Sequence, residues 1–406
     1  MYSMRNHSRP PKRRRPRLFG FVVFLILLAL GYNYIRPLPH ASASISPLAS
    51  EAGTVNLRWP AEGSAAIGAQ GFGLLATHGS QAVKPTASLA KLITVLAVLE
   101  KRPLKQGEPG PTIKLTQADV DLFNKYFGQG GAYVKVEVGE EITQYQALQA
   151  ILLPSANNMA DSLAIWAFGS IQQYHAYANE MTKRLGLTQT TVAGDASGML
   201  PDTTSTPTDL VKLGDLAMQN PVMAEIVGQK SAAIPVHGTI YSANSRLGYN
   251  NIIGIKTGLT DEAGGCFLFA AKYIAKGAKK PVTIIGVITG APSLPAALNG
   301  SEPLLNSAKP YFTIETPVKA GEVFGMLTTP WLQTSRVVAK QDITLLTWRG
   351  TALKPEVKLG SINRSLPAGA QVGTAIVASG SNQGNAPLVL QQSITGPNWQ
   401  WRIKRF

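Results

Sequence analysis

The pattern of apolar and polar residues changes several times along the chain, and each change indicates a different kind of element. Residues 18–35 are almost continuously apolar, and at about 1.5 Å per residue a helix of this length can cross a bilayer. Residues 85–99 are apolar on every side, which predicts a helix buried within a domain. Residues 252–260 are rich in β-branched side chains and predict a strand. After residue 317, short alternating runs separated by glycine and proline predict a small all-β sandwich.

These patterns predict more than one folded unit. At 406 residues the chain exceeds the usual size of a single domain, so two domains and a short targeting segment are expected. The expected units, in chain order, are a basic tail with a membrane segment at 1–36, a linker rich in Ala, Ser and Pro at 37–54, a larger domain at 55–315, a β-sandwich at 316–395 and an aromatic and basic tail at 396–406.

The N-terminal segment has two interpretations. Ala41-Ser42-Ala43 has the small-x-small pattern of a signal-peptide cleavage site, but the apolar stretch is longer than the ~7–15 residues of a typical signal-peptide core. The length favours an uncleaved anchor. In both cases the arginines before the stretch stay in the cytoplasm, so the rest of the chain is expected outside it, at the cell membrane.

The net charge of +15 is unevenly distributed. Eight positive charges and no acidic residue lie before residue 44, which leaves about +7 for the remainder. No compact basic motif recurs after residue 44, so the sequence argues against a nucleic-acid partner. The remaining mild basicity suits an anionic membrane or wall.

The single cysteine, Cys266, excludes an intramolecular disulfide. It lies in the apolar run 266–271, which is typical of a buried strand. A small buried apolar residue is therefore the interpretation of Cys266, rather than a reactive thiol.

Ser88 and Lys91 are the first candidate for chemistry. They are three residues apart on the predicted buried helix, so their side chains share one face. Burial lowers the pKa of a lysine, and a neutral lysine can take the proton of a neighbouring serine hydroxyl. The plainer alternative is that Lys91 extends to water and Ser88 caps the helix, because Ser-x-x-Lys alone is a common pattern.

Two further segments carry candidate residues. Pro154 breaks an apolar helical run, which places Ser155 and Asn157 in a turn where side chains can point into a cleft, although both are also ordinary turn and cap residues. Lys256 and Thr257 lie at the centre of the strand predicted at 252–260, and Gly258 allows a close approach of the backbone. A ligand could pair with the edge of this strand, where Lys256 would bind a carboxylate or assist proton transfer and Thr257 would donate a hydrogen bond.

The three segments together resemble a known family. Ser88-Leu89-Ala90-Lys91, Ser155-Ala156-Asn157 and Lys256-Thr257-Gly258, in this order, are similar to the three motifs of penicillin-binding serine DD-peptidases and class A β-lactamases. Longer stretches, above all residues 254–266 and also 194–198 and 244–247, resemble the low-molecular-mass D-alanyl-D-alanine carboxypeptidases. The resemblance covers roughly residues 55–310.

The resemblance implies a fold and a set of roles. The expected fold is an α/β (α+β) catalytic domain with an antiparallel sheet flanked by helices and a buried nucleophile helix, followed by an all-β domain. Ser88 would attack the bond between the two D-alanines of a peptidoglycan stem peptide, with Lys91 as the base. Ser155 would relay a proton to the leaving amine together with Lys256, and Asn157 would hold the peptide and orient Lys91.

The same resemblance assigns the oxyanion hole to the backbone N–H groups of Ser88 and Leu259, next to Gly258, and a hydrogen bond to the substrate carboxylate to Thr257. β-Lactams would inhibit the enzyme by acylating Ser88. No metal or cofactor is expected, because the five histidines are scattered without paired spacing.

Two other functions stay open. A class A β-lactamase would carry a deacylating glutamate between the second and third motifs, where Glu180 and Glu225 are the only glutamates and neither has a Glu-x-x-x-Asn context. A non-catalytic wall-binding scaffold would be expected to have lost residues from at least one of the three motifs, and all three motifs are intact. The end of the chain, 396–406, is expected to form either a headgroup contact or, more plainly, a strand with a basic tail.

Overall fold

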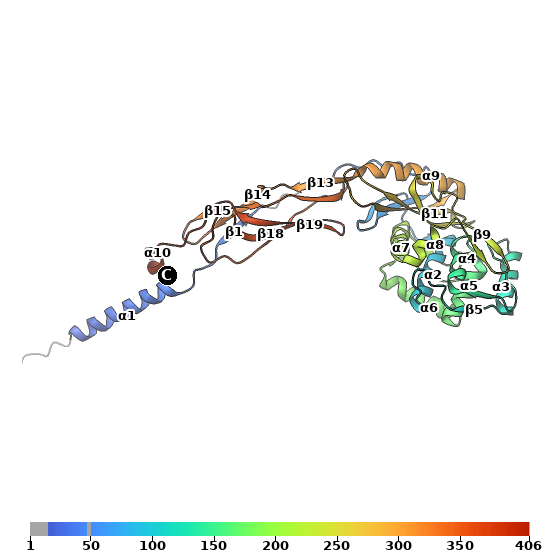
Figure 1. Cartoon of the computed structure of the whole chain (residues 1–406), viewed down its shortest axis with the longest axis horizontal. Coiled ribbons are helices and arrows are strands. Elements are labelled where there is room, and N and C mark those ends of the chain that lie inside the picture. The colour runs from blue at the N-terminus through green and yellow to red at the C-terminus, as the bar shows by residue number, and fades with distance from the viewer. Residues whose placement is uncertain (1–14, 47–49, 406) are drawn as a thin grey trace, which may run out of the picture.

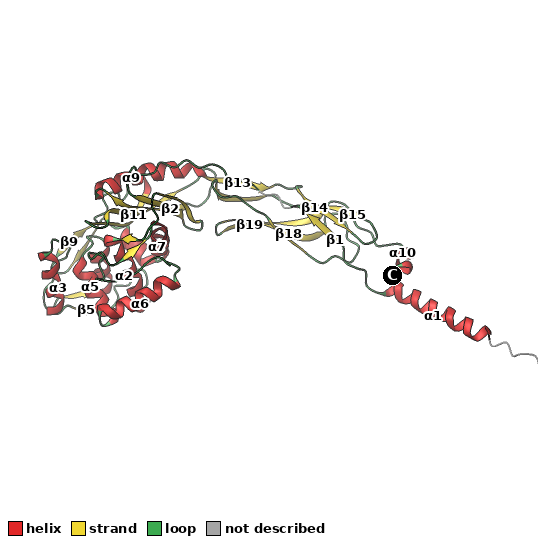
Figure 2. Ribbon diagram, turned by 180° about the vertical axis from the view of Figure 1, so that it is seen from behind, coloured by secondary structure: helices red, strands yellow, loops and turns green. Residues whose placement is uncertain are grey.

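The computed structural model describes residues 15–46 and 50–405 and gives an elongated molecule. A mixed helix and sheet domain occupies one end, a sheet-rich region lies in the middle, and helix α1 (Arg15–Ile35) projects at the other end (Figure 1). The view from behind shows the same order, with most helices gathered in the first domain (Figure 2). The expected α/β catalytic part and sheet-rich C-terminal part are confirmed.

The first domain is built on a five-stranded antiparallel sheet in the order β10-β11-β12-β2-β3. Its strands are β2 (Ser64–Ala69), β3 (Gly73–His78), β10 (Ile252–Thr260), β11 (Gly264–Tyr273) and β12 (Val282–Ala291). Helix α9 (Leu294–Ala308) contacts β11 and β12, and helix α7 (Pro207–Gln219) contacts β2, β11 and β12. Strand β10 is an edge strand, as a ligand-pairing role requires.

A helical region packs beside β10 and α7 around a large apolar core. Its helices are α2 (Ala90–Lys101), α3 (Gln117–Gly128), α4 (Gln144–Leu152), α5 (Asn157–Phe168), α6 (Ile171–Arg184) and α8 (Pro221–Val227). Short strand pairs connect them, namely β4 (Lys84–Pro85) with β7 (Thr204–Ser205), β5 (Thr112–Lys114) with β6 (Glu141–Thr143), and β8 (Ser231–Ile234) with β9 (Gly238–Tyr241). Helix α2 contacts α4, α5, α6 and α7, so the predicted buried helix is found. It begins at Ala90 rather than at residue 85, because Lys84–Pro85 pairs as strand β4 and Ala87–Leu89 forms a 3₁₀ turn.

The sheet-rich region contains a six-stranded sheet in the order β1-β14-β15-β19-β18-β17 and a two-stranded β13-β16 sheet. The strands are β1 (Ser42–Ile45), β13 (Phe312–Val318), β14 (Val323–Thr328), β15 (Thr334–Ala339), β16 (Ile343–Trp348), β17 (Glu356–Leu359), β18 (Gln371–Ser379) and β19 (Asn382–Leu390). One apolar cluster joins residues of both sheets. Strand β13 runs across the boundary expected at 315, and Phe312 and Trp348 belong to the core on the α9 side of the first domain.

Two expectations for the ends of the chain are corrected. Residues 42–45, expected in a linker, form strand β1 and pair with β14, because small residues fit a sheet edge without any apolar alternation that would reveal a strand. The strand expected within 396–406 is wrong, because this segment contains the short helix α10 (Trp399–Lys404), whose first turn is capped by Asn398 accepting from the Trp401 N–H at 2.8 Å. Helix α10 contacts α1.

Helix α1 has the properties of a membrane span. Residues 18–35 are long and apolar enough to cross a bilayer, and none of this stretch is buried inside the protein. The basic cluster between Arg5 and Arg14 lies outside the described residues.

Candidate active site

Ser88 lies on a one-turn 3₁₀ helix, Ala87–Leu89, that leads directly into α2. The Lys91 Nζ atom lies 2.8 Å from the Ser88 Oγ atom, so the spacing of three residues brings the two groups together as predicted. The Lys91 side chain is fully buried, and Ser88 makes no capping hydrogen bond. The alternative in which Lys91 reaches water and Ser88 caps the helix is therefore wrong.

The surroundings of Lys91 lower its pKa. Burial is the main cause, and the positive charge of Lys256 adds to it, while the carboxylates of Asp195 and Asp161 oppose both effects. Lys91 Nζ donates to Asn157 Oδ1 at 2.7 Å and to the Ser197 carbonyl oxygen at 2.9 Å. The amine is thus held by protein acceptors in a place where its neutral form is favoured.

Ser155 and Asn157 come from the connection between α4 and α5. Asn157 is the first residue of α5, and its N–H donates to the Ala132 carbonyl oxygen at 2.7 Å. Ser155 has a φ of 68°, a left-handed conformation that is uncommon for a residue with a side chain. Its Oγ atom is buried without a hydrogen-bond partner among the described residues. A strained residue with an unpaired buried hydroxyl is typical of a functional position.

Lys256 and Thr257 are buried at the centre of β10, opposite Leu268 and Phe267 of β11. Lys256 Nζ donates to the Thr257 carbonyl oxygen at 3.1 Å, and burial lowers the pKa of Lys256 to about 7. Besides burial, the positive charge of Lys256 lowers the pKa of Lys91, so the two amines are electrostatically coupled.

Gly258 brings the edge strand against the turn that carries Ser88. A Cβ atom at position 258 would lie 3.1 Å from the Ser88 amide nitrogen and 3.1 Å from the Ala87 Cβ atom, which is tighter than normal contact. The next residue, Leu259, is 56% exposed near the end of the strand. All eight predicted site residues therefore lie on segments that meet around Ser88 or along β10 beside it.

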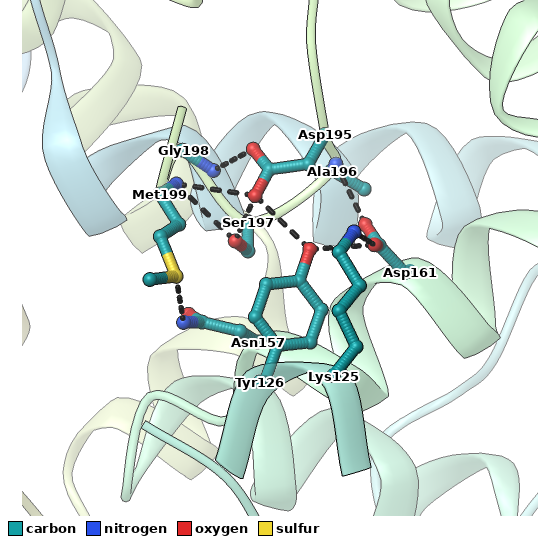
Figure 3. A network of polar contacts seen from close by, with 9 residues as sticks. All are labelled: Lys125, Tyr126, Asn157, Asp161, Asp195, Ala196, Ser197, Gly198 and Met199. Carbon is teal, nitrogen blue, oxygen red and sulfur yellow. Dashed lines mark hydrogen bonds and ion pairs between the residues drawn. The ribbon is translucent and has the colours of Figure 1, made fainter. Parts of the chain in front are cut away.

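The sequence interpretation assigned no role to a second layer behind Lys91. Tyr126, Asp161, Asp195 and Ser197 form a buried network of hydrogen bonds, drawn in Figure 3. Residues 194–198 were noted only for their resemblance to the family. The one available signal was the carboxylate of Asp161, four residues after Asn157 and the only charged residue of its helix, at a position where an unpaired charge is costly.

The glutamates that a β-lactamase interpretation would use lie elsewhere. Glu225 Oε1 accepts from the Tyr145 hydroxyl at 2.6 Å, and Glu180 is an exposed residue of α6. Neither is hydrogen-bonded to Ser88, Lys91 or Ser155 in the part of the chain that the structure describes. Within residues 15–46 and 50–405, no group of three or more His, Cys, Asp or Glu side chains could hold a metal ion.

Comparison with known proteins identifies the family. Residues 61–293 match the family described as D-alanyl-D-alanine carboxypeptidase, and the chain belongs to this family of serine peptidases. A D-alanyl-D-alanine carboxypeptidase of Streptomyces sp. (strain K15) is 27% identical over 251 residues, covering 57% of this chain and 81% of that protein. A D-alanyl-D-alanine endopeptidase of Haemophilus influenzae is 28% identical over 221 residues, covering 53% of this chain and 70% of that protein.

Solved structures extend the similarity in fold to the sheet-rich region. Penicillin binding protein 5 from Haemophilus influenzae has a TM-score of 0.59 at 17% identity, with 85% of this chain and 100% of that chain covered. The Streptomyces K15 DD-transpeptidase has a TM-score of 0.53 at 24% identity and covers 64% of this chain and 98% of its own. At these identities the likeness establishes the fold.

Proposed function

We propose that the protein removes the terminal D-alanine from peptidoglycan stem peptides through an acyl-enzyme on Ser88. The observation that carries this proposal is the 2.8 Å separation of Ser88 Oγ from the buried amine of Lys91. A neutral amine has two N–H bonds and one lone pair. The two N–H bonds match the Asn157 and Ser197 oxygens, which leaves the lone pair for the Ser88 hydroxyl proton.

The first half-reaction forms the acyl-enzyme. Lys91 takes the hydroxyl proton as Ser88 Oγ attacks the carbonyl carbon between the two D-alanines. The backbone N–H groups of Ser88 and Leu259 stabilise the oxyanion, and the approach at Gly258 supports this assignment because it brings the two backbones together. The C–N bond then breaks, and the nitrogen of the departing D-alanine receives a proton through Ser155.

The second half-reaction returns the enzyme to its starting state. Water attacks the acyl carbon as Lys91 takes one of its protons, the bond to Ser88 Oγ breaks and Oγ receives that proton from Lys91, and the shortened peptide leaves with a new carboxylate. Lys256 supports proton transfer through Ser155, for which a pKa of about 7 is suitable near neutral pH. Thr257 donates a hydrogen bond to the terminal carboxylate of the substrate, and Asn157 holds the peptide.

β-Lactams present a strained amide in place of the peptide bond, so they acylate Ser88 and inhibit the enzyme. A class A β-lactamase needs a glutamate that activates the deacylating water, and Glu225 is engaged with Tyr145 while Glu180 is exposed. A scaffold without activity would not require the buried Lys91 amine, which costs folding free energy. Both alternatives are therefore less well supported.

We also propose that α1 stays in the protein as a membrane anchor, with the catalytic domain outside the cytoplasm. The Arg405 guanidinium donates to the carbonyl oxygens of Asn33 and Pro37 at 2.7–3.0 Å, and Arg36 donates to the Arg405 carbonyl oxygen at 2.8 Å. The bond to Asn33 satisfies a carbonyl group in the last turn of α1, which lacks a helical partner because Pro37 has no N–H. Strand β1 contains Ser42 and Ala43 of the small-x-small pattern and pairs with β14, so the folded protein uses the segment that cleavage would divide.

The test of this function uses the full-length protein in detergent. Wild type, Ser88→Ala and Lys91→Ala are incubated separately with a fluorescent penicillin and with a peptide ending in D-Ala-D-Ala. Label and D-alanine release should be lost together in both variants. Retention of label by Ser88→Ala would place the nucleophile elsewhere, and label without D-alanine release in the wild type would limit the protein to penicillin binding.

A further inference from the structure

The loop of residues 195–199 contacts Lys91 and the turn that carries Ser88. Its Ser197 carbonyl oxygen accepts from Lys91 Nζ at 2.9 Å. Gly198, with a φ of 70°, lies so close to the Ala87 carbonyl group that a side chain there would overlap it. Thr94 on α2 donates from its hydroxyl to the Ala196 carbonyl oxygen at 2.6 Å. The position of this loop therefore determines where the Lys91 amine is held.

Two buried carboxylates hold the loop. Asp195 Oδ1 accepts from the Gly198 N–H at 2.9 Å, and Asp195 Oδ2 accepts from the Ser197 hydroxyl at 2.6 Å. Asp161 Oδ1, on α5, accepts from the Ala196 N–H at 2.9 Å. Figure 3 shows both carboxylates at the loop: Asp195 belongs to the loop itself, and Asp161 reaches it from the neighbouring helix α5. Both groups are more than nine-tenths buried, so their hydrogen bonds are needed for their stability.

The hydroxyl of Tyr126 joins the two carboxylates. It lies 2.6 Å from Asp161 Oδ2, to which it donates, and 3.1 Å from Asp195 Oδ2. Burial and the two neighbouring carboxylates raise the pKa of Tyr126, so the phenol keeps its proton and remains a donor. Lys125, the residue before it, places an ammonium group 3.9 Å from Asp161 Oδ2. Helix α3 thus supplies the hydrogen-bond donor that the two acids share.

We propose that Tyr126, together with Asp161 and Asp195, is a positioning residue that fixes the Ser197 carbonyl group and thereby the Lys91 amine. The proposal rests on the function proposed above and adds residues that act through Lys91. None of the three is hydrogen-bonded to Ser88 in the described part of the chain. Their carboxylates also oppose the effect of burial on Lys91 and keep its pKa from falling further.

The experiment compares Tyr126→Phe with Tyr145→Phe in the full-length protein. Both substitutions remove a phenolic hydroxyl that donates to a carboxylate, but Tyr145 bonds to Glu225 and Gln229, away from the Ser88 turn. In Tyr126→Phe we expect kcat for D-alanine release and the rate constant of penicillin acylation to fall about tenfold, since one charge-assisted hydrogen bond is lost. KM should stay within about twofold, because substrate-binding groups are unchanged.

The split between kcat and KM distinguishes positioning from a general loss of structure. Equal kcat values in Tyr126→Phe and Tyr145→Phe, or a change in KM alone, would overturn the proposal. If Tyr126→Phe does not fold, Ser197→Ala gives the second test, because it removes a donor to Asp195 and leaves the Ser197 carbonyl group in place. It should lower kcat in the same way, and an unchanged kcat would contradict the proposal.

The outcome is separable from the proposed function. If Ser88→Ala is still labelled, the proposed function is wrong, whatever the Tyr126 variant does. If labelling depends on Ser88 but Tyr126→Phe has unchanged kinetics, only the positioning role of Tyr126 is wrong.

Discussion

Lys91 and Lys256 are two buried lysines of one site, and the positive charge of Lys256 lowers the pKa of Lys91 in addition to the effect of burial. Only the first of them is hydrogen-bonded to Ser88, while the amine of Lys256 bonds to the Thr257 carbonyl oxygen. This electrostatic coupling allows two amines, one of them the base, to lie in the same small apolar region. When one of them carries a proton, protonation of the other becomes less favourable.

Burial of Lys256 should make stability depend on pH. Its pKa is about 7 in the folded protein and 10.5 in the unfolded chain, so the folded state binds fewer protons between these values and stability rises with pH there. Lys256→Met should therefore be more stable than wild type near pH 7, by on the order of 2–4 kcal/mol. The gain should shrink toward pH 10.5, as measured by urea unfolding of the catalytic domain.

The matched control for this change is Lys272→Met, which replaces an exposed lysine on the neighbouring strand β11. The free energy of unfolding of Lys272→Met should depend on pH in the same way as that of the wild type. A constant difference between Lys256→Met and wild type from pH 7 to 10 would contradict the assigned pKa.

Lys91→Met should remove the base and leave the buried helix packed. We expect acylation of Ser88 by a fluorescent penicillin to slow by about 10²–10⁴-fold, the usual contribution of a positioned base. Lys101→Met, at the exposed end of the same helix, controls for loss of positive charge on α2. Labelling of Lys91→Met at a rate within a few-fold of Lys101→Met would mean that another group accepts the proton.

Gly258→Ala tests the close approach of β10 to Ser88. The added methyl group would press on the Ser88 amide nitrogen and move an oxyanion donor, so acylation should fall by about 10²-fold. Gly128→Ala is the matched control, because a Cβ atom at that position meets no atom within 4 Å. Acylation rates measured by stopped-flow labelling give the comparison, and equal rates in both variants would count against the oxyanion assignment.

The sequence predicted the parts of the site that depend on local spacing. Ser88 and Lys91 could be paired because a helix brings residues three apart onto one face, and Asn157 could be placed because Pro154 interrupts a helix. Gly258 indicated a close backbone approach without revealing its partner, which is the Ser88 turn 170 residues earlier.

The network behind Lys91 could not be predicted in this way. Tyr126 and Asp195 are 69 residues apart. The packing of α3 against α5 brings the phenol to Asp161, while Asp195 reaches it from the loop of residues 195–199. Strand β1 was missed for a similar reason. Ser44 pairs with Met326, which lies far along the chain, and residues 42–45 have no alternation of apolar and polar side chains that would indicate a strand. Long-range contacts of this kind are set by the fold, and a single sequence without internal repeats carries little trace of them.

The anchor proposal makes a prediction about the mature protein. Protein extracted from membranes should retain the residues before Ala43, because α1 and β1 are held by Arg405 and by β14. Intact mass measurement of wild type and of Ala41→Leu, which blocks a small-x-small site, should give masses that differ only by the substitution. A wild-type mass that begins at Ser44, with a longer Ala41→Leu chain, would show that the segment is a cleaved signal peptide.

The central claim is that one hydroxyl group, on Ser88, forms the covalent intermediate with Lys91 as its base. The most direct measurement is mass spectrometry of the penicillin-treated full-length protein, followed by proteolysis to locate the adduct. The account predicts one penicilloyl group, on the peptide containing Ser88, in the wild type and none in Ser88→Ala. An adduct on any other residue, or an equal adduct in Ser88→Ala, would contradict the account.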